Sequence, residues 1–112
     1  MSEFIDKLTS YGADVTTALE RFANDESLYE MCFNLLLDDE NFAMLKSSID
    51  SNDYENAFKA GHALKGVIAN LELTPLNGPI SNLVESLRTN DCSKIDSQYT
   101  AVLIAYNELK AL

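Results

Sequence analysis

Residues 57–71 read AFKAGHALKGVIANL and contain His62, the single histidine of the chain. If the stretch is helical, at about 100° per residue, its apolar residues collect on one stripe. The stripe consists of Ala57, Gly61, Leu64, Ile68 and Leu71. Such a stripe is typical of a helix that packs one face against a core. His62 lies about 160° from the centre of the stripe, so the pattern predicts an exposed imidazole.

The surface around His62 is predicted from the same periodicity. Its neighbours at i−4, i+3, i+4 and i+7 are Phe58, Lys65, Gly66 and Ala69. The predicted helix therefore displays an imidazole beside an ammonium group and two positions with almost no side chain. A second macromolecule can bring its backbone close to such an imidazole.

The rest of the chain also has helical spacing, and no alternating run is long enough to indicate a strand. Turn and capping residues divide it into predicted helices over residues 2–11, 14–22, 26–37, 54–71, 80–89 and 93–109. A further helix is expected to restart at residues 38–40 and to run through Phe42, Leu45 and Ile49, and it is alternatively a kinked continuation of 26–37. We expect an all-α fold in a single domain, residues 1–112. The expected architecture is an antiparallel four-helix bundle of the long helices with one or two short helices at the N-terminal side.

Several local expectations follow from the same patterns. In the helix over 26–37, the inward residues are expected to be Leu28, Met31, Cys32 and Leu35. The apolar face of this helix is unusually wide, because it also includes Tyr29, Phe33 and Leu37. In the helix over 80–89, the expected inward residues are Ile80, Leu83, Val84 and Leu87.

Two helix starts are also expected. Thr74 is read as a cap with Pro75 at the first helical position, and Gly78-Pro79 is expected to disrupt the first turns that follow. Ser93 is read as the cap of the last helix. Along that helix, a 4-3-4-3 seam is formed by Ile95, Tyr99, Val102, Tyr106 and Leu109.

The formal net charge of −10 limits the classes of partner. Residues 1–56 contain 13 acidic and 3 basic residues, and residues 57–112 contain 5 of each. Nucleic acid needs a basic surface for its phosphates, and an anionic membrane disfavours an acidic protein. Neither is an expected partner.

Cysteine content and hydropathy indicate a cytoplasmic protein. Cys32 and Cys92 are too few for a disulfide framework, and Cys32 is expected to be a buried thiol. The N-terminus lacks the basic region and apolar run of a signal peptide, and no stretch has the length that spans a bilayer. We expect a monomer, because one bundle can bury every apolar stripe.

His62 is the strongest candidate for chemistry, although a lone histidine on a polar face is more often without a role. A metal site needs further ligands, and Glu55 is the only carboxylate within two turns on the same helix. No motif positions a serine or cysteine nucleophile for His62 to activate. An imidazole with its ordinary pKa of about 6.5 is largely neutral near pH 7 and can itself be a nucleophile.

The segment HALKG, residues 62–66, followed by Ala69-Asn70-Leu71, resembles the His-x-x-Lys-Gly signature of histidine-containing phosphotransfer (HPt) domains. Gly61 fits the small residue that this family has just before its histidine. The resemblance also covers the length, the helical pattern and the acidic balance of the whole chain. Two departures are Ala69, where the family usually has glycine, and Glu72-Leu73, where small residues are common.

The resemblance implies a phosphocarrier rather than an enzyme. His62 would accept a phosphoryl group from a receiver-domain aspartate and pass it to another receiver. Lys65 would offset the charge of the phosphoryl group, while Phe58, Gly66 and Ala69 would contact the receiver. The chain itself would need no cofactor, since Mg²⁺ belongs to the receiver.

The sequence leaves one alternative function open and disfavours another. The first is a helical bundle that binds a receiver or kinase without phosphotransfer. The second is the phosphoacceptor helix of a histidine kinase, which has an acidic residue after the histidine and Thr/Asn-Pro four residues on. Here Ala63 and Gly66-Val67 occupy those positions, and no glycine-rich ATP-binding region is present.

Overall fold

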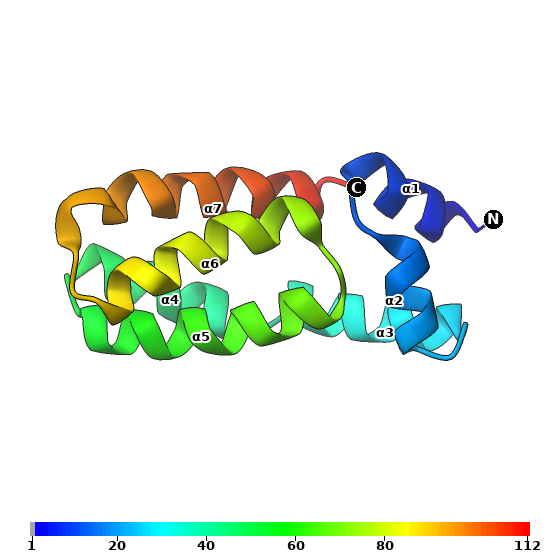
Figure 1. The fold of residues 1–112 in the computed structure, drawn as a ribbon, viewed down its shortest axis with the longest axis horizontal. Helices are drawn as coiled ribbons and strands as arrows, with labels where there is room; N and C mark the ends of the chain where they lie inside the picture. The colour runs from blue at the N-terminus through cyan, green and yellow to red at the C-terminus, as the bar shows by residue number, and fades with distance from the viewer. Residues whose placement is uncertain (1) are drawn as a thin grey trace.

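The computed structural model describes residues 2–112, so the first residue of the predicted domain lies outside the described residues. Within this range the chain is helical, with seven α-helices, one short 3-10 turn (η1) and no strand (Figure 1). The elements are α1 (Glu3–Tyr11), α2 (Val15–Arg21), α3 (Glu26–Leu37), α4 (Asn41–Asp50), α5 (Tyr54–Asn70), α6 (Thr74–Arg88), η1 (Cys92–Lys94) and α7 (Ile95–Lys110). The molecule is elongated, measuring 43 × 20 × 20 Å. The expected all-α class is confirmed.

Side-chain caps explain where most of these helices begin. The first free N–H groups of a helix need acceptors, and Ser, Asp and Asn side chains supply them. Four helices start in this way, with caps at Ser2, Asp14, Asp25 and Asp53. These four starts agree with the sequence prediction because capping depends on neighbouring residues alone.

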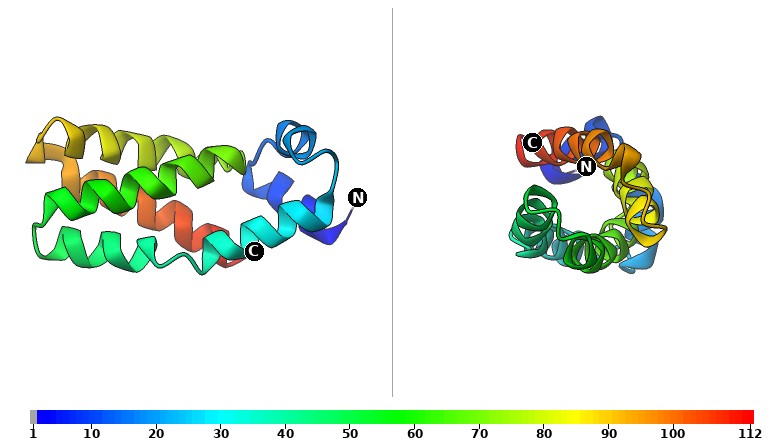
Figure 2. Two further views of the ribbon diagram at one scale, coloured as in Figure 1. Left: turned by 90° about the horizontal axis from the view of Figure 1, so that it is seen from below. Right: turned by 90° about the vertical axis from the view of Figure 1, so that its left-hand side faces the viewer.

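The long helices α4 to α7 pack on one another in chain order. α4 lies against α5, α5 against α6, and α6 against α7 (Figures 1 and 2). Their shared interior contains leucine, isoleucine and valine side chains that are almost fully buried, among them Leu45, Leu64, Ile68, Leu83 and Val102. Between α4 and α7 the contact is made by aromatic rings. Phe42 stacks on Tyr106, with ring centroids 3.7 Å apart and planes at 8°.

Helices α1 to α3 cover the end of this assembly where α5 turns into α6 (Figure 1). The Tyr29 hydroxyl of α3 donates to the Leu71 carbonyl over 2.8 Å, and the Tyr11 hydroxyl of α1 donates to the Ala105 carbonyl over 3.0 Å. The backbone N–H of Asp14 donates to the Glu72 carbonyl over 3.0 Å. α3 and α4 are separate helices, since residues 38–40 between them are not helical.

The orientation predicted for α3 is wrong. Its buried residues are Tyr29, Phe33 and Leu36, whereas Leu28, Met31 and Leu35 are exposed. Cys32, expected to be buried, is only half-buried. The aromatic side chains face inward because the rings of the first two helices meet them there. Phe4 packs edge-on against Tyr29 and Phe33, and Phe22 stacks on Tyr29.

The helix start predicted at Thr74-Pro75 is confirmed to within one residue, since Thr74 is the first helical residue of α6 rather than its cap. The disruption expected at Gly78-Pro79 is wrong, because the helix runs unbroken through both residues. A proline normally disfavours helical backbone in the residue before it, through a clash with that residue's Cβ. Gly78 has no Cβ, which removes that part of the clash. Only one backbone hydrogen bond, from the missing N–H of Pro79, is lost.

The start of the last helix differs from the prediction as well. Asp91, not Ser93, is the cap, and it caps the 3-10 turn. Its carboxylate accepts hydrogen bonds from the Ser93 backbone N–H at 3.1 Å and from the Ser93 hydroxyl at 2.6 Å. The α-helix then begins at Ile95. Most of the predicted α7 seam is buried, while Tyr106 is half-buried. The four inward residues predicted in α6 are all buried.

Candidate functional site

The helix that carries His62 is α5, and its orientation is as predicted. All five residues of the predicted stripe are buried. Gly61 lets α6 come close, since a Cβ added there would lie 3.0 Å from Cγ2 of Val84. His62, the next residue, is exposed. The tight contact at Gly61 therefore fixes the side of α5 on which the imidazole reaches solvent.

Phe58 lies directly beside the imidazole. The two rings are 5.6 Å apart between centroids, and their planes are inclined by only 16°. Phe58 is half-buried and packs against the core, so it gives the imidazole a fixed apolar neighbour on one side. The structure thus brings together Phe58 and His62, as the helical spacing predicted.

Lys65, one turn after His62, is half-buried and lies toward α6. There it acts on Glu85, whose side chain is bonded to Arg88. The hydrogen bonds from Arg88 hold the pKa of the Glu85 carboxyl below its ordinary value, and the charges of Arg88 and Lys65 lower it further. The charged surface around His62 therefore continues onto α6, at two residues that the sequence analysis did not select.

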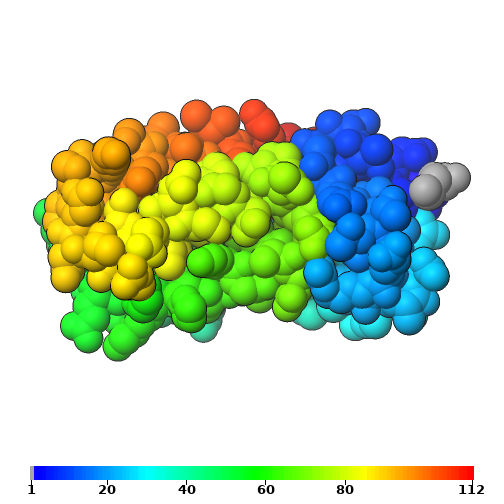
Figure 3. Space-filling model, viewed as in Figure 1, coloured from blue at the N-terminus to red at the C-terminus, as the bar shows by residue number. Residues whose placement is uncertain are grey.

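The surface of α5 at Gly66 and Ala69 is open. Gly66 is exposed, and no atom lies within 4 Å of the position that a Cβ would occupy there. Ala69, one turn on, is half-buried. The two small residues of the predicted site thus leave the backbone of α5 accessible close to the imidazole. Figure 3 shows α5 and α6 side by side on one face of the molecule.

A hollow of about 440 Å³ adjoins this surface between the start of α5 and the end of α6. Its wall includes Phe58, so the ring that stacks on His62 also borders the hollow. Lys59 and Arg88 supply two cations to its lining. Both are already paired with carboxylates, Lys59 with Glu55 at 3.8 Å and Arg88 with Glu85.

The C-terminal end of α5 is held by Arg21 of α2. The last turn of α5 has no basic residue of its own. The Arg21 guanidinium donates to the Asn70 carbonyl over 2.7 Å and pairs with Glu72 at 2.9 Å. A cation at this end stabilises a helix, because the last carbonyl groups carry partial negative charge. Arg21 could not be selected from the sequence, since only the fold brings residues 21 and 70 together.

The structure describes no metal centre near His62. Across residues 2–112, no three His, Cys, Asp or Glu side chains gather in an arrangement that could hold a metal ion. Glu55, the carboxylate closest to His62 along α5, is paired with Lys59.

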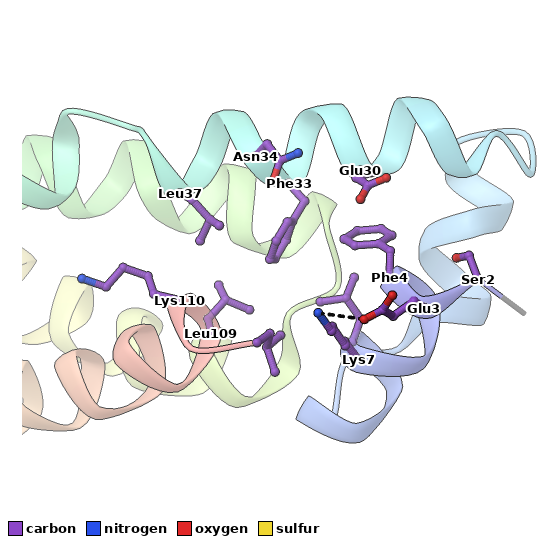
Figure 4. Close-up of a pocket in the computed structure, with 12 residues that line it drawn as sticks. Ser2, Glu3, Phe4, Lys7, Glu30, Phe33, Asn34, Leu37, Leu109 and Lys110 are labelled. Atoms are coloured by element: carbon purple, nitrogen blue, oxygen red, sulfur yellow. Dashed lines mark ion pairs between the residues drawn. The ribbon is translucent and has the colours of Figure 1, made fainter.

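A separate hollow of about 510 Å³ lies between α1, α3 and the end of α7 (Figure 4). Its lining is half apolar, with Phe4, Phe33 and Leu109, and half polar or charged, with Glu30 and Lys110. Lys7, at its edge, is paired with Glu3 at 3.3 Å. His62 is not part of this hollow, and we assign it no chemistry.

Comparison of the chain with protein-family models, with curated proteins and with solved structures finds no match. Of the helices in residues 2–112, none has both the length and the hydropathy needed to cross a membrane. The functional assignment therefore depends on the local geometry around His62.

Proposed function

We propose that this protein is a histidine phosphotransfer protein of a two-component phosphorelay. In this proposal α4 to α7 form an antiparallel four-helix bundle of the HPt kind, and His62 carries the phosphoryl group. The chain acts as a monomer in the cytoplasm, without nucleic acid or membrane as partners. Its partners are receiver domains of response regulators or of hybrid histidine kinases.

The observation that carries the proposal is the exposed imidazole on α5, flanked by Lys65 and by the open backbone at Gly66. A receiver must bring its phosphoaspartate to within about 3–3.5 Å of the attacking nitrogen. An open surface permits that approach, whereas a large side chain at residue 66 would prevent it.

The transfer step needs no base from this chain. The lone pair of Nε2 attacks phosphorus, a P–N bond forms, and the P–O bond to the receiver's aspartate breaks. The electron pair of that bond stays on the aspartate, which leaves as a carboxylate. The imidazole keeps its proton on Nδ1 during attack. We choose Nε2 as the nucleophile because it lies farther from the backbone and reaches further into a docked partner.

Lys65 and Phe58 have supporting roles in this step. A phosphoryl group adds a charge of about −1.5 to −2 near neutral pH, and the half-buried Lys65 ammonium offsets part of it. Phe58 fixes the plane of the imidazole by stacking on it. A Mg²⁺ ion held by the receiver would supply further stabilisation of the charge on the transferring group.

The proposal is tested by a mass measurement after the protein is incubated with several phosphorylated receiver domains. We expect a gain of one phosphoryl group on His62, in a bond that acid breaks and alkali does not. His62→Gln should abolish uptake and leave the melting temperature nearly unchanged, because the side chain is exposed. If the intact wild type gains no phosphoryl mass from any receiver, the protein is a helical bundle that only binds its partner.

Two further variants test the surface around His62. Gly66→Leu should slow transfer by about tenfold to 100-fold, because the side chain holds the receiver away from the imidazole. Helicity should be kept or slightly increased, since leucine is a better helix former than glycine. Lys65→Ala should have a milder effect on the rate. Transfer to Gly66→Leu at the wild-type rate would refute the role given to the open surface.

A further inference from the structure

The outward face of α3 is apolar. Leu28, Met31 and Leu35 recur at i, i+3 and i+7, so they form one stripe along the helix. They are 39%, 53% and 65% exposed, respectively. α3 lies on the outside of the molecule, as the left view of Figure 2 shows. We refer to these three residues as the α3 stripe.

The α3 stripe contributes little to the core, since none of its three residues is buried. The core contribution of α3 comes from its other face, where Tyr29, Phe33 and Leu36 are buried. Exposed apolar side chains scattered singly need no explanation, but a contiguous row on one helix marks a contact surface. Methionine suits such a surface, because its flexible side chain adapts to different partners.

Acidic and polar groups border the α3 stripe. A shallow hollow of about 410 Å³ on this face is lined by Met31 and Leu35 together with Ser27, Glu30, Asn34 and Asp38. Both carboxylates therefore lie beside Met31 and Leu35, along one side of the α3 stripe. No ion pair of Glu30 or Asp38 with a basic side chain is present in the described part of the chain.

The charge of residues 22–45, which include α3, indicates which kind of partner would bind there. Residues 22–45 contain no lysine or arginine and six acidic residues, namely Asp25, Glu26, Glu30, Asp38, Asp39 and Glu40. A second copy of the chain would bring these carboxylates against their own counterparts, and each copy has a net charge of −10. Like charges across an interface are unfavourable. A complementary partner is basic at its edges and apolar at its centre.

We propose that the α3 stripe is a docking site for an amphipathic helix of another protein, with an apolar row flanked by lysine or arginine. The apolar row packs between Leu28, Met31 and Leu35 at i/i+3/i+7 spacing, which is a common mode of helix recognition. Lysine or arginine side chains pair with Glu30 and Asp38 at the edges. This site is on a different helix from His62, and its binding does not require phosphotransfer.

The experiment uses two synthetic helical peptides of about four turns. Both have leucines at i, i+3 and i+7, one with flanking lysines and the other with flanking glutamates. Each is titrated into the full chain, with affinity followed by fluorescence anisotropy and the binding surface by amide NMR. We expect the lysine peptide to shift residues of α3 and to bind about tenfold or more tightly than the glutamate peptide. Added salt should weaken its binding.

Two variants locate the site. Leu35→Gln should weaken binding of the lysine peptide by about tenfold. The matched control is Ile104→Gln on α7, because Ile104 is also exposed, at 56%. The control should bind like the wild type. Both variants should keep the wild-type circular dichroism, since neither residue is buried.

Four results would overturn the proposal. They are no binding of the lysine peptide, equal binding of both peptides, NMR shifts confined to other helices, and equal losses in the two variants. A wild-type dimer in sedimentation that Leu35→Gln abolishes would also overturn it, by assigning the α3 stripe to a second copy.

Discussion

The outer faces of α5 and α3 differ in what they offer to a partner. α5 presents an imidazole, an ammonium group and a bare backbone at Gly66, whereas α3 presents a row of aliphatic side chains. The inner faces differ too. α5 packs closely on α6 through Gly61, while α3 reaches its neighbours with the rings of Tyr29 and Phe33. The outer face of α5 leaves room for the backbone of a partner to come close. The outer face of α3 instead offers apolar side chains for contact.

This difference explains why one orientation was predictable and the other was not. α5 has a single apolar stripe, so burying it leaves only one possible outer face. α3 is apolar on both sides, and its own periodicity allows either side to face the core. The choice comes from Phe4, Phe22 and the Leu71 carbonyl, which give Tyr29 ring contacts and a hydrogen-bond acceptor.

The largest expected effect is a loss of stability on the inner face of α3. Tyr29→Ala removes a fully buried ring and the hydrogen bond to Leu71. We expect it to lower the free energy of unfolding by about 3–5 kcal/mol. Leu35→Ala on the outer face should change it by no more than about 0.5 kcal/mol. Urea titrations of both variants measure the two values.

The reverse order of these two effects would mean that the aliphatic face of α3 is the buried one. In that case the outward stripe would be aromatic, and the docking site proposed on α3 would be lost with it.

Alanine substitutions at the two glycines of α5 should change the free energy of unfolding by smaller amounts. Gly61→Ala places a Cβ 3.0 Å from Val84 Cγ2, whose buried side chain has little room to move. We expect overpacking to outweigh the gain in helix propensity and to lower the free energy of unfolding by about 1–2 kcal/mol. Gly66→Ala, with open space around it, should raise that free energy by about 0.5–1 kcal/mol. Thermal or urea unfolding distinguishes the signs.

A double variant tests whether contact with Val84 causes the destabilisation expected for Gly61→Ala. In a Val84→Ala background the added methyl group has space, so Gly61→Ala should no longer be destabilising relative to Val84→Ala alone. If the penalty persists there, contact with Val84 is not its cause.

A pH dependence of stability links α3 to the turn after α5. Burial, with smaller contributions from the charges of Glu72 and Asp14, raises the pKa of Tyr29 to about 12 from an ordinary value of 10.0. The folded state therefore keeps this proton when the unfolded state has lost it. The resulting stability is present below pH 10 and is lost as the pH rises from about 10 to about 12.

Tyr29→Phe should reduce the loss of stability at alkaline pH, because it removes the ionisable hydroxyl and keeps the ring. Tyr11, whose pKa is also raised to about 12 by burial, should account for a further part. Unfolding midpoints in urea between pH 9 and pH 12 compare the variant with the wild type. Parallel pH profiles would show that the Tyr29 hydroxyl does not ionise differently in the two states.

The sequence by itself determined where most helices begin and which face of α5 is buried. Caps such as Ser2, Asp14 and Asp53 act on residues two or three positions away, and a single apolar stripe leaves one choice of orientation. The exposure of His62 and the arrangement of Phe58, Lys65 and Gly66 around it follow from that periodicity. These parts of the candidate site were predictable because they lie on one helix.

Only the tertiary structure decided the features that depend on distant residues. The inward side of α3 follows from rings on α1 and α2, and Arg21 reaches the end of α5 from 49 positions away in sequence. Glu85 joins the surface around Lys65 because α6 packs on α5 at Gly61. Periodicity says which residues share a face of a helix. It does not say which other helix that face will meet, because that choice depends on packing between segments far apart in the chain.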